Sequence, residues 1–399
     1  MRRILGLASC MLATIAIVCL ETETRAGNSG TAKDTATPAN VGDKGATGTW
    51  DRKTAAAYLD KRAGWWMDWP KAARDHGTFC VSCHTAVPYA MARPLLRGAL
   101  GERGPSEDER RLLENVTKRV RMWKEAEPFY SDADRGAYKT VESRGTESVL
   151  DAVILASHDA SNDASGGAGS GHLSDDTRTA FENMWAEQQT TGEDKGAWRW
   201  LRFKNEPWEA DDSDYYGAAL AAVAVGTAPE NYRASPEIQG NLTLLREYLN
   251  RECAAQTAIN RAVLLWASAK VPGLLEAERR KAIIDELLSK QEPDGGWSLS
   301  SLVGGWKRHD GTPQEAESDG YATGLIAFAL QQAGIAPGNA QLKRGLAWLA
   351  ENQNKTSGSW LAYSLNKSVE HHISPETALF MNDAATAYAV FALSESKGR

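Results

Sequence analysis

A unit that occurs three times between residues 178 and 360 limits the folds that this sequence can adopt. In each copy a helical segment reaches a Gln, a short turn containing Gly follows, and a Trp closes the unit. The copies are residues 343–353 with Gly358 and Trp360, residues 281–290 with Gln291, Gly295 and Trp297, and, more loosely, residues 178–189 with Gly196 and Trp198. Such self-similarity is typical of stacked helical pairs, in which neighbouring units bury one another's apolar faces.

The spacing of apolar residues indicates helices from Trp50 onward, because it follows a three- and four-residue period. Helices that reach a Gln carry Lys, Arg and Glu on one face, as an outer layer would. Helices after each Trp are rich in Ala and Gly, as a close-packed inner layer would be. The predicted outer–inner pairs are 54–62 with 80–100, 106–123 with 147–158, 174–189 with 214–225, 238–251 with 256–269, 276–290 with 319–333, and 339–353 with 383–394. We therefore predict an all-α fold whose six pairs close a ring, with an exposed loop at 159–171.

Three of the predicted inner helices open with an aspartate, at Asp214, Asp319 and Asp383. A carboxylate at a helix N-terminus accepts hydrogen bonds from free backbone N–H groups and interacts favourably with the helix dipole. We expect these side chains to cap their own helices at one mouth of the ring.

The repeats resemble the QW motifs of the squalene–hopene cyclase and terpene cyclase superfamily. Gln291, Gly295 and Trp297 fit that pattern without a gap, the copy from Gln353 to Trp360 carries one inserted residue, and the copy at Gln189 carries more. The resemblance covers residues 140–399. It implies an (α/α)6 toroid of alternating outer and inner helices, like the C-terminal domain of squalene cyclase, in which each Gln and Trp braces successive outer helices.

The same resemblance suggests an acid site. Class II cyclases of the family protonate an alkene with an Asp-x-Asp-Asp motif, and a carboxylic acid can do this only where its surroundings keep it protonated. Two incomplete matches occur, at residues 209–212 and at residues 212–214. Asp212 and Asp214 are therefore catalytic candidates of an isomerase- or lyase-type enzyme acting on an apolar substrate, with helix capping as the alternative.

A different chemistry is indicated by Cys80, Cys83 and His84, which form a C-x-x-C-H motif. This is the pattern of c-type haem attachment, because two thiols reach the vinyl groups of one porphyrin edge and the next imidazole reaches the iron. A zinc half-site, a structural disulfide or coincidence are the alternatives, although a zinc site normally shows a second ligand pair. We predict covalent haem c on Cys80 and Cys83, with His84 as an axial ligand of the iron.

The predicted place of the motif is the N-terminal end of an inner helix, so the haem would lie at one mouth of the ring. The aromatic side chains just before it could cover the porphyrin or could pack in the core; they are Trp65, Trp66, Trp69 and Phe79. Met91 follows on the same helical face as His84 and cannot easily reach the far side of the haem. The candidates for a sixth ligand are His76, His309, His371 and His372. A His or Met ligand there would favour electron transfer, and an open position would favour chemistry on a small molecule.

The N-terminus predicts export. Residues 1–26 combine a basic start, an apolar run and a small residue at Ala26, as a cleaved signal peptide does, and residues 27–48 resemble a flexible low-complexity tether. Residues 49–399 would then form a single toroid in the periplasm or outside the cell, with no integral membrane span in the mature form. The formal net charge of −7 comes without a basic stripe, which argues against nucleic acid as a partner.

Three functions from different classes agree with these observations. The first is an exported c-type haem protein that passes electrons to or from a redox partner protein. The second is an enzyme whose toroid cavity takes a small apolar or saccharide substrate, with the haem or an inner-ring carboxylate as the reactive group. The third is a non-catalytic binding module.

Overall fold

The computed structural model describes residues 49–130, 136–164, 171–367 and 374–395. This part of the chain is mostly helical, which confirms the predicted all-α class, and it also contains a two-stranded antiparallel sheet of β1 (Ala73–Arg74) and β2 (Thr78–Phe79). The helices are α1 (Arg52–Asp68), α2 (Ala86–Leu100), α3 (Glu107–Arg121), α5 (Ala137–Ala164), α6 (Asp175–Glu187), α7 (Ser213–Thr227), α8 (Gln239–Glu252), α9 (Ala258–Lys270), α10 (Ala277–Ser289), α11 (Leu299–Leu302), α12 (Gly320–Gln332), α13 (Ala340–Glu351) and α14 (Phe380–Glu395).

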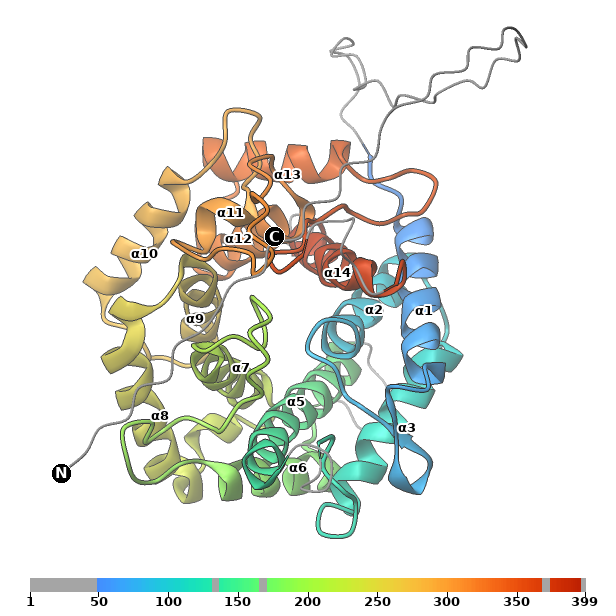
Figure 1. Cartoon of the computed structure of the whole chain (residues 1–399), viewed down its shortest axis with the longest axis vertical. Helices are drawn as coiled ribbons and strands as arrows, with labels where there is room; N and C mark the ends of the chain where they lie inside the picture. The colour runs from blue at the N-terminus through green and yellow to red at the C-terminus, as the bar shows by residue number, and fades with distance from the viewer. Residues whose placement is uncertain (1–48, 131–135, 165–170, 368–373, 396–399) are drawn as a thin grey trace, which may run out of the picture. The chain divides into compact units, whose positions relative to one another are not determined.

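Contacts among six of the described helices form a closed cycle (Figure 1). In order around the cycle these inner helices are α2, α5, α7, α9, α12 and α14, and α14 packs against α2. A second set lies against them: α1 packs on α2, α3 and α6 on α5, α8 on α7, α10 on α9, and α13 on α12. Two layers of helices therefore bury a common core, as the alternation of charged and small-residue helices predicts. The predicted pairing is wrong for three outer helices, because α6, α8 and α10 pack mainly on the inner helix that precedes them in the chain and not on the one that follows.

The inner helices are buried almost all round because their side chains are small. Every residue of α12 from Gly320 to Gln331 is buried, and α7 is buried from Ser213 to Val225. At Gly324 a β-carbon would lie 2.8 Å from the backbone N of Ala389 in α14, so only glycine allows α12 and α14 to approach this closely. Small residues thus set the spacing of the inner layer.

The Gln–Trp units connect consecutive outer helices through hydrogen bonds. Gln291 Nε2 donates to the backbone O of Gly295, 2.8 Å away, and to that of Gln341 at the start of α13, 2.7 Å away. Trp297 Nε1 donates to the backbone O of Leu287 at 2.7 Å, so the indole covers the end of α10. One amide side chain therefore satisfies carbonyl groups of its own turn and of the next outer helix.

The copy near α6 uses a different glutamine from the one that its sequence suggests. Gln188 Nε2 donates to the backbone O of Gly196 at 3.0 Å and to that of Asn241 in α8 at 3.1 Å. The choice of Gln189 is therefore wrong by one position. The reason is that Gln188 ends the helix as its C-terminal cap, and the chain then turns before Gln189.

The last Gln–Trp unit joins the end of the chain to its beginning. Gln353 Nε2 donates to the backbone O of Asp51 at 2.9 Å, and the backbone N of Asp51 donates to Gln353 Oε1 at 2.7 Å. The rings of Trp50 and Trp360 meet edge to face with centroids 6.1 Å apart. The bond that links α10 to α13 is thus repeated between α13 and α1, which closes the cycle of outer helices.

Helix α5 is longer at both ends than the predicted helix at residues 147–158. Helix α5 extends to Ala164, so the first part of the predicted loop at 159–171 is helical. Asp159 explains this difference, because its carboxylate accepts from the backbone N of Ser174 at 2.9 Å and from the hydroxyl of Thr177 at 2.7 Å. A side chain in the extra turn of α5 therefore holds the start of α6.

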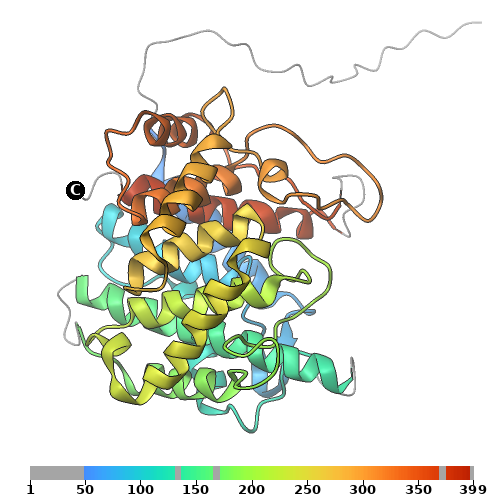
Figure 2. The same ribbon diagram turned by 90° about the vertical axis from the view of Figure 1, so that its left-hand side faces the viewer.

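The predicted signal peptide at residues 1–26 and the tether at residues 27–48 lie outside the described residues, and the described part of the chain forms one compact unit. Among the helices described, none is both long enough and apolar enough to cross a membrane. Figure 2 shows the long loops before α12 and α14 at the same end of the helices as the small β1–β2 sheet.

Candidate functional site

A cavity of about 710 Å³ lies at the end of the helices where these loops gather. Its described walls come from residues within 66–84, 201–209, 364–367 and 377–381, together with Phe129, Tyr130 and Thr146. Cys80, Cys83 and His84 all line it. The C-x-x-C-H motif therefore lies in the wall of a cavity large enough for a ligand of several rings.

The motif precedes α2 rather than forming its first turn, so the prediction of a helix from residue 80 is wrong. The helix begins at Ala86, and the Ser82 hydroxyl oxygen accepts from the backbone N of Thr85 at 3.3 Å and of Ala86 at 3.0 Å. Cys80 N also donates to the backbone O of Ala72 at 2.8 Å, next to the β1–β2 pair. Ser82, which lies between the two cysteines, thus caps the helix. The chain before it is extended and continues the backbone hydrogen bonding of the β1–β2 pair.

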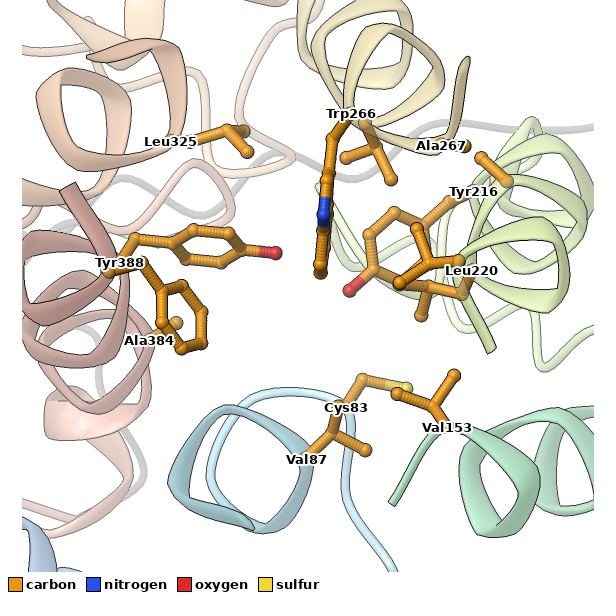
Figure 3. Close-up of a cluster of buried hydrophobic side chains, with 14 of the residues drawn as sticks. Cys83, Val87, Val153, Tyr216, Leu220, Trp266, Ala267, Leu325, Ala384 and Tyr388 are labelled. Carbon is orange, nitrogen blue, oxygen red and sulfur yellow. The ribbon is translucent and has the colours of Figure 1, made fainter. Parts of the chain in front are cut away.

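Both cysteines of the motif are free thiols in this structure. Cys83 is buried and Cys80 is half-buried, and burial raises the pKa of each thiol. Figure 3 shows Cys83 in a cluster of buried side chains that includes Val87, Val153 and Tyr216. The Trp66 indole N–H donates to the backbone O of Cys80 at 2.7 Å, which fixes the other end of the motif.

The hydrogen bonds of His84 define its tautomer. Its Nδ1 lies 2.8 Å from Oγ1 of Thr85, and the Thr85 hydroxyl donates its single hydrogen to Oδ2 of Asp383 at 2.7 Å. Thr85 can therefore only accept from His84, which places the imidazole proton on Nδ1. Burial, and to a smaller extent the positive charge of Arg62, lower the pKa of His84 to about 3. The imidazole is thus neutral, and Nε2 retains the lone pair that a metal ligand needs.

Asp383 is held by groups from α1. It accepts from Arg62 Nε at 2.7 Å, from Arg62 Nη2 at 3.0 Å and from the Tyr58 hydroxyl at 2.9 Å. The expected cap of α14 is not formed, because that helix begins at Phe380 and places Asp383 inside its first turn. Asp319 does cap α12 as predicted, accepting from the backbone N of Tyr321 at 2.9 Å and of Ala322 at 3.0 Å.

Aromatic rings surround His84. Phe380 stacks on the imidazole with centroids 3.9 Å apart and planes inclined by 24°, Trp66 meets it edge to face at 5.0 Å, and Trp208 lies at 5.8 Å. Trp66 and Trp69 line the cavity, as a cover for a porphyrin requires, and Trp65 stacks on Trp69 at 5.2 Å. Phe79 instead lies in β2, where its backbone N donates to Asn115.

Charged side chains of both signs also line the cavity. Lys71, Arg74 and Lys367 supply positive charge, and Glu206 and Glu209 supply carboxyl groups. Burial raises the pKa of Glu206 to about 8, with Asp212 and Asp211 adding to the effect, and it raises the pKa of Glu209 to about 7. The two glutamic acids can therefore hold protons near neutral pH.

The two candidate acids from the cyclase resemblance have other partners. Asp214 forms an ion pair with Arg202, with Oδ2 and Nη2 2.5 Å apart, and burial raises its pKa to about 6. Asp212 accepts from Nδ2 of Asn260 at 3.0 Å and does not cap α7 with its side chain, although it stands at the N-cap position. Neither aspartate is among the described residues that line the cavity.

The candidates for a sixth ligand divide into two groups. His76 and His309 are in the described part of the chain but do not line the cavity; His76 contacts Asp75 at 3.3 Å, and His309 Nε2 lies 3.4 Å from the backbone O of Lys204. His371 and His372 lie outside the described residues. Met381 lines the cavity and is buried, which the sequence did not suggest.

Several other site residues were also missed from sequence. Thr85 directly follows the motif and could have been examined as the partner of His84, whereas Arg62 and Phe380 come from distant helices and carry no local signal. Comparisons of the chain with the models of protein families and with curated proteins find no match.

Proposed function

We propose that this chain carries a covalent c-type haem in the cavity and functions in electron transfer. Cys80 and Cys83 would form the thioether bonds, and Nε2 of His84 would be an axial ligand. The observation that carries this proposal is the state of His84: neutral, bonded through Nδ1, and next to two free thiols in the wall of a cavity. When bound, haem supplies an iron that accepts and releases one electron.

The other groups in the cavity wall fit a haem. The volume of about 710 Å³ falls within the range of cofactor sites, roughly 300–1,000 Å³. Trp66, Trp69 and Phe380 supply apolar faces, and Lys71, Arg74 and Lys367 complement the two carboxylates that every haem carries. These side chains would bind and orient the group and would keep water from its faces.

An aromatic route from the motif to the surface supports electron transfer over other haem functions. The ring of Trp66 lies 5.0 Å from that of His84 and 5.5 Å from that of Trp69. Trp69 stacks on Trp65, and both are half-buried. We infer that a redox partner protein would approach at this edge of the cavity.

We also propose that the scaffold is an (α/α)6 toroid like the C-terminal domain of squalene cyclase. The closed cycle of helix contacts supports it, as do the hydrogen bonds from the glutamine of each Gln–Trp unit to the backbone O of the glycine in the same unit. The acid role of Asp212 and Asp214 has no such support, because neither lines the cavity. The signal-like residues 1–26, together with the attachment motif, favour a periplasmic or secreted protein, since thioether attachment of haem occurs outside the cytoplasm in bacteria.

The proposal is tested by producing the chain with a haem-maturation system and measuring the pyridine haemochrome spectrum of the denatured protein. The wild type should retain haem through denaturation, Cys80→Ser and Cys83→Ser should each lose one thioether bond, and the double variant should lose covalent haem. Cys253→Ser is the matched control, because Cys253 is a buried cysteine that does not line the cavity and should not affect attachment. A wild type without a haemochrome band would overturn the proposal.

A second function, redox chemistry on a small molecule, is favoured by one observation: neither of the two candidate histidines in the described residues lines the cavity. Absorption and resonance Raman spectra of the ferrous protein, with and without carbon monoxide, distinguish the two functions. Six-coordinate iron that is lost in Met381→Ala would support electron transfer. Five-coordinate iron that binds carbon monoxide at once would support small-molecule chemistry.

A further inference from the structure

We propose that Thr85 and Asp383 form a relay that positions His84 and lowers the reduction potential of the haem; this inference rests on the proposed function. The relay has two hydrogen bonds, from His84 Nδ1 to Thr85 Oγ1 at 2.8 Å and from the Thr85 hydroxyl to Asp383 Oδ2 at 2.7 Å. Both point in the same direction, so the imidazole proton is drawn toward a carboxylate through one hydroxyl group.

The relay is protected from water. Thr85 is 2% exposed and Asp383 1%, so solvent does not compete for either hydrogen bond. The far end of the relay, the carboxylate of Asp383, is charged, because the guanidinium of Arg62 donates to both of its oxygens. Arg62 is itself 4% exposed. Hydrogen bonds that end on an ionised group in a dry site are strong and polarise one another.

The local structure leaves the Thr85 hydroxyl available for this purpose. Thr85 stands at the N-cap position of α2 but makes no capping bond with its side chain, because Ser82 takes that role. Helix α14 contributes twice, since Phe380 stacks on the imidazole and Asp383, three residues later in the same helix, anchors Thr85. Helix α14 thus contacts the ring face of His84 through Phe380 and fixes its Nδ1 atom through Asp383 and Thr85.

The consequence for a bound haem follows from ligand chemistry. A carboxylate behind the N–H group of a metal-bound imidazole raises the basicity of the nitrogen that binds the metal and fixes the ring orientation. A more basic axial ligand stabilises the oxidised iron more than the reduced iron and therefore lowers the reduction potential. Thr85 and Asp383 act through His84, so they are positioning residues.

The structure also offers a simpler role for Asp383, as a buried tie between α1 and α14. Thr85→Val separates the two roles, because it removes the hydroxyl but leaves the bonds of Arg62 and Tyr58 to Asp383 intact. Asp383→Asn would not separate them, since the loss of a negative charge near the haem raises the potential by itself.

The test is a redox titration of the haem-loaded full chain, followed by absorbance, for the wild type and for variants of Thr85. Thr85→Val should shift the reduction potential upward, and Thr85→Ser, which restores a hydroxyl group, should return it toward the wild-type value. Thr85→Ala serves in place of Thr85→Val should that variant not fold. Unfolding midpoints in urea are measured in parallel to show that the helix pair α1–α14 is intact.

The outcomes are distinct. An unchanged potential in a folded, haem-loaded Thr85→Val protein would overturn the relay and leave the proposed function standing. The same upward shift in Thr85→Ser as in Thr85→Val would also overturn it, because the hydroxyl would then be irrelevant. A wild type that carries no haem would overturn the proposed function, and the relay with it.

Discussion

The starts of α12 and α14 occupy equivalent positions in the repeat, and each carries an aspartate that has a different set of partners. Asp319 precedes α12 and accepts from backbone N–H groups of that helix and from Leu299 N at 2.7 Å. Asp383 lies inside α14 and binds Arg62, Tyr58 and Thr85. One aspartate stabilises its own helix, whereas the other connects α1 to the start of α2 and reaches His84 of the C-x-x-C-H motif through Thr85.

The backbone explains the difference. The 3-10 turn Thr377–Leu379 leads directly into α14, so the helix starts at Phe380. Asp383 is therefore the fourth residue of the helix, inside its first turn instead of before it, and a buried carboxylate at that place must find its donors elsewhere. Asp214 likewise stands inside the first turn of α7, is not the N-cap that the sequence predicts, and pairs with Arg202. Repetition in sequence thus preserves the residue but not its chemistry, and of the three predicted caps only Asp319 forms one.

The largest expected effect comes from removing the aspartate of α14. Asp383→Ala leaves the buried Arg62 guanidinium without its charge partner, which should lower the free energy of unfolding by about 3–5 kcal/mol. Asp319→Ala removes a cap and should cost only about 1–2 kcal/mol. Urea denaturation at neutral pH measures both.

The matched control for Asp383→Ala is the double variant Arg62→Met with Asp383→Leu, which buries no unpaired charge and should recover much of the loss. Equal destabilisation by Asp383→Ala and Asp319→Ala would contradict the distinction between the two helix starts.

A third carboxyl group extends the comparison, because Glu206 has neither the backbone donors of Asp319 nor an arginine like that of Asp383. Its pKa is raised from 4.5 to about 8, so the folded state binds this proton more tightly than the unfolded chain does. The free energy of unfolding must then fall as the pH rises between these two values.

Glu206→Gln removes that dependence. The variant should match the wild type near pH 4 and exceed it by about 2 kcal/mol at pH 6, because the unfolded wild type gains ionisation free energy that the folded state does not. Thermal unfolding at a series of pH values measures the difference in the free energy of unfolding between the two proteins. The contributions of Glu209 and Asp319 cancel in this difference, because both proteins contain them. Parallel curves from pH 4 to pH 8 would show that folding does not raise the pKa of Glu206.

The helices could be predicted from sequence because their information is local. The apolar period, the small residues and the Asp before Gly320 each concern neighbours in the chain, and α12 was predicted to within one residue at its start. The relay could not be predicted, because Thr85 and Asp383 are 298 residues apart and meet only when α14 packs against α2.

Other errors have equally physical causes. Two adjacent glutamines offer the same amide, and only the turn after α6 selects Gln188 over Gln189. The start of α2 was placed too early because Ser82 acts as a cap from within the motif, a role that competes with the helical continuation that its neighbours suggest. Interpretation from sequence neighbours alone thus fails where two adjacent residues offer the same group, or where a residue of the motif also caps a helix.

The closure of the cycle can be compared with an ordinary step of the repeat. Gln353→Ala should lower the free energy of unfolding by about 1–2 kcal/mol, because it leaves backbone groups of Asp51 and Gly358 without a partner. Gln291→Ala should cost less, since Gln291 is half-buried and water can replace it. Urea denaturation measures both losses. A larger loss in Gln291→Ala would show that the Gln353 bonds, which close the cycle, do not contribute more to stability than the Gln291 bonds.

The smallest effects are expected at the start of α7, where the cyclase resemblance placed a catalytic acid. Asp214 pairs with Arg202, whose side chain is 31% exposed, and Asp212 binds Asn260, so neither aspartate reaches the motif as Asp383 does. Asp212→Asn should alter the free energy of unfolding by less than about 1 kcal/mol. Asp212→Asn and Asp214→Asn should both leave haem content and reduction potential at wild-type values in the titration that moves Thr85→Val. A shift in either variant as large as that of Thr85→Val would mean that the inner-helix aspartates act on the cavity as a group, and that the bond of Asp383 to Thr85 does not set it apart from them.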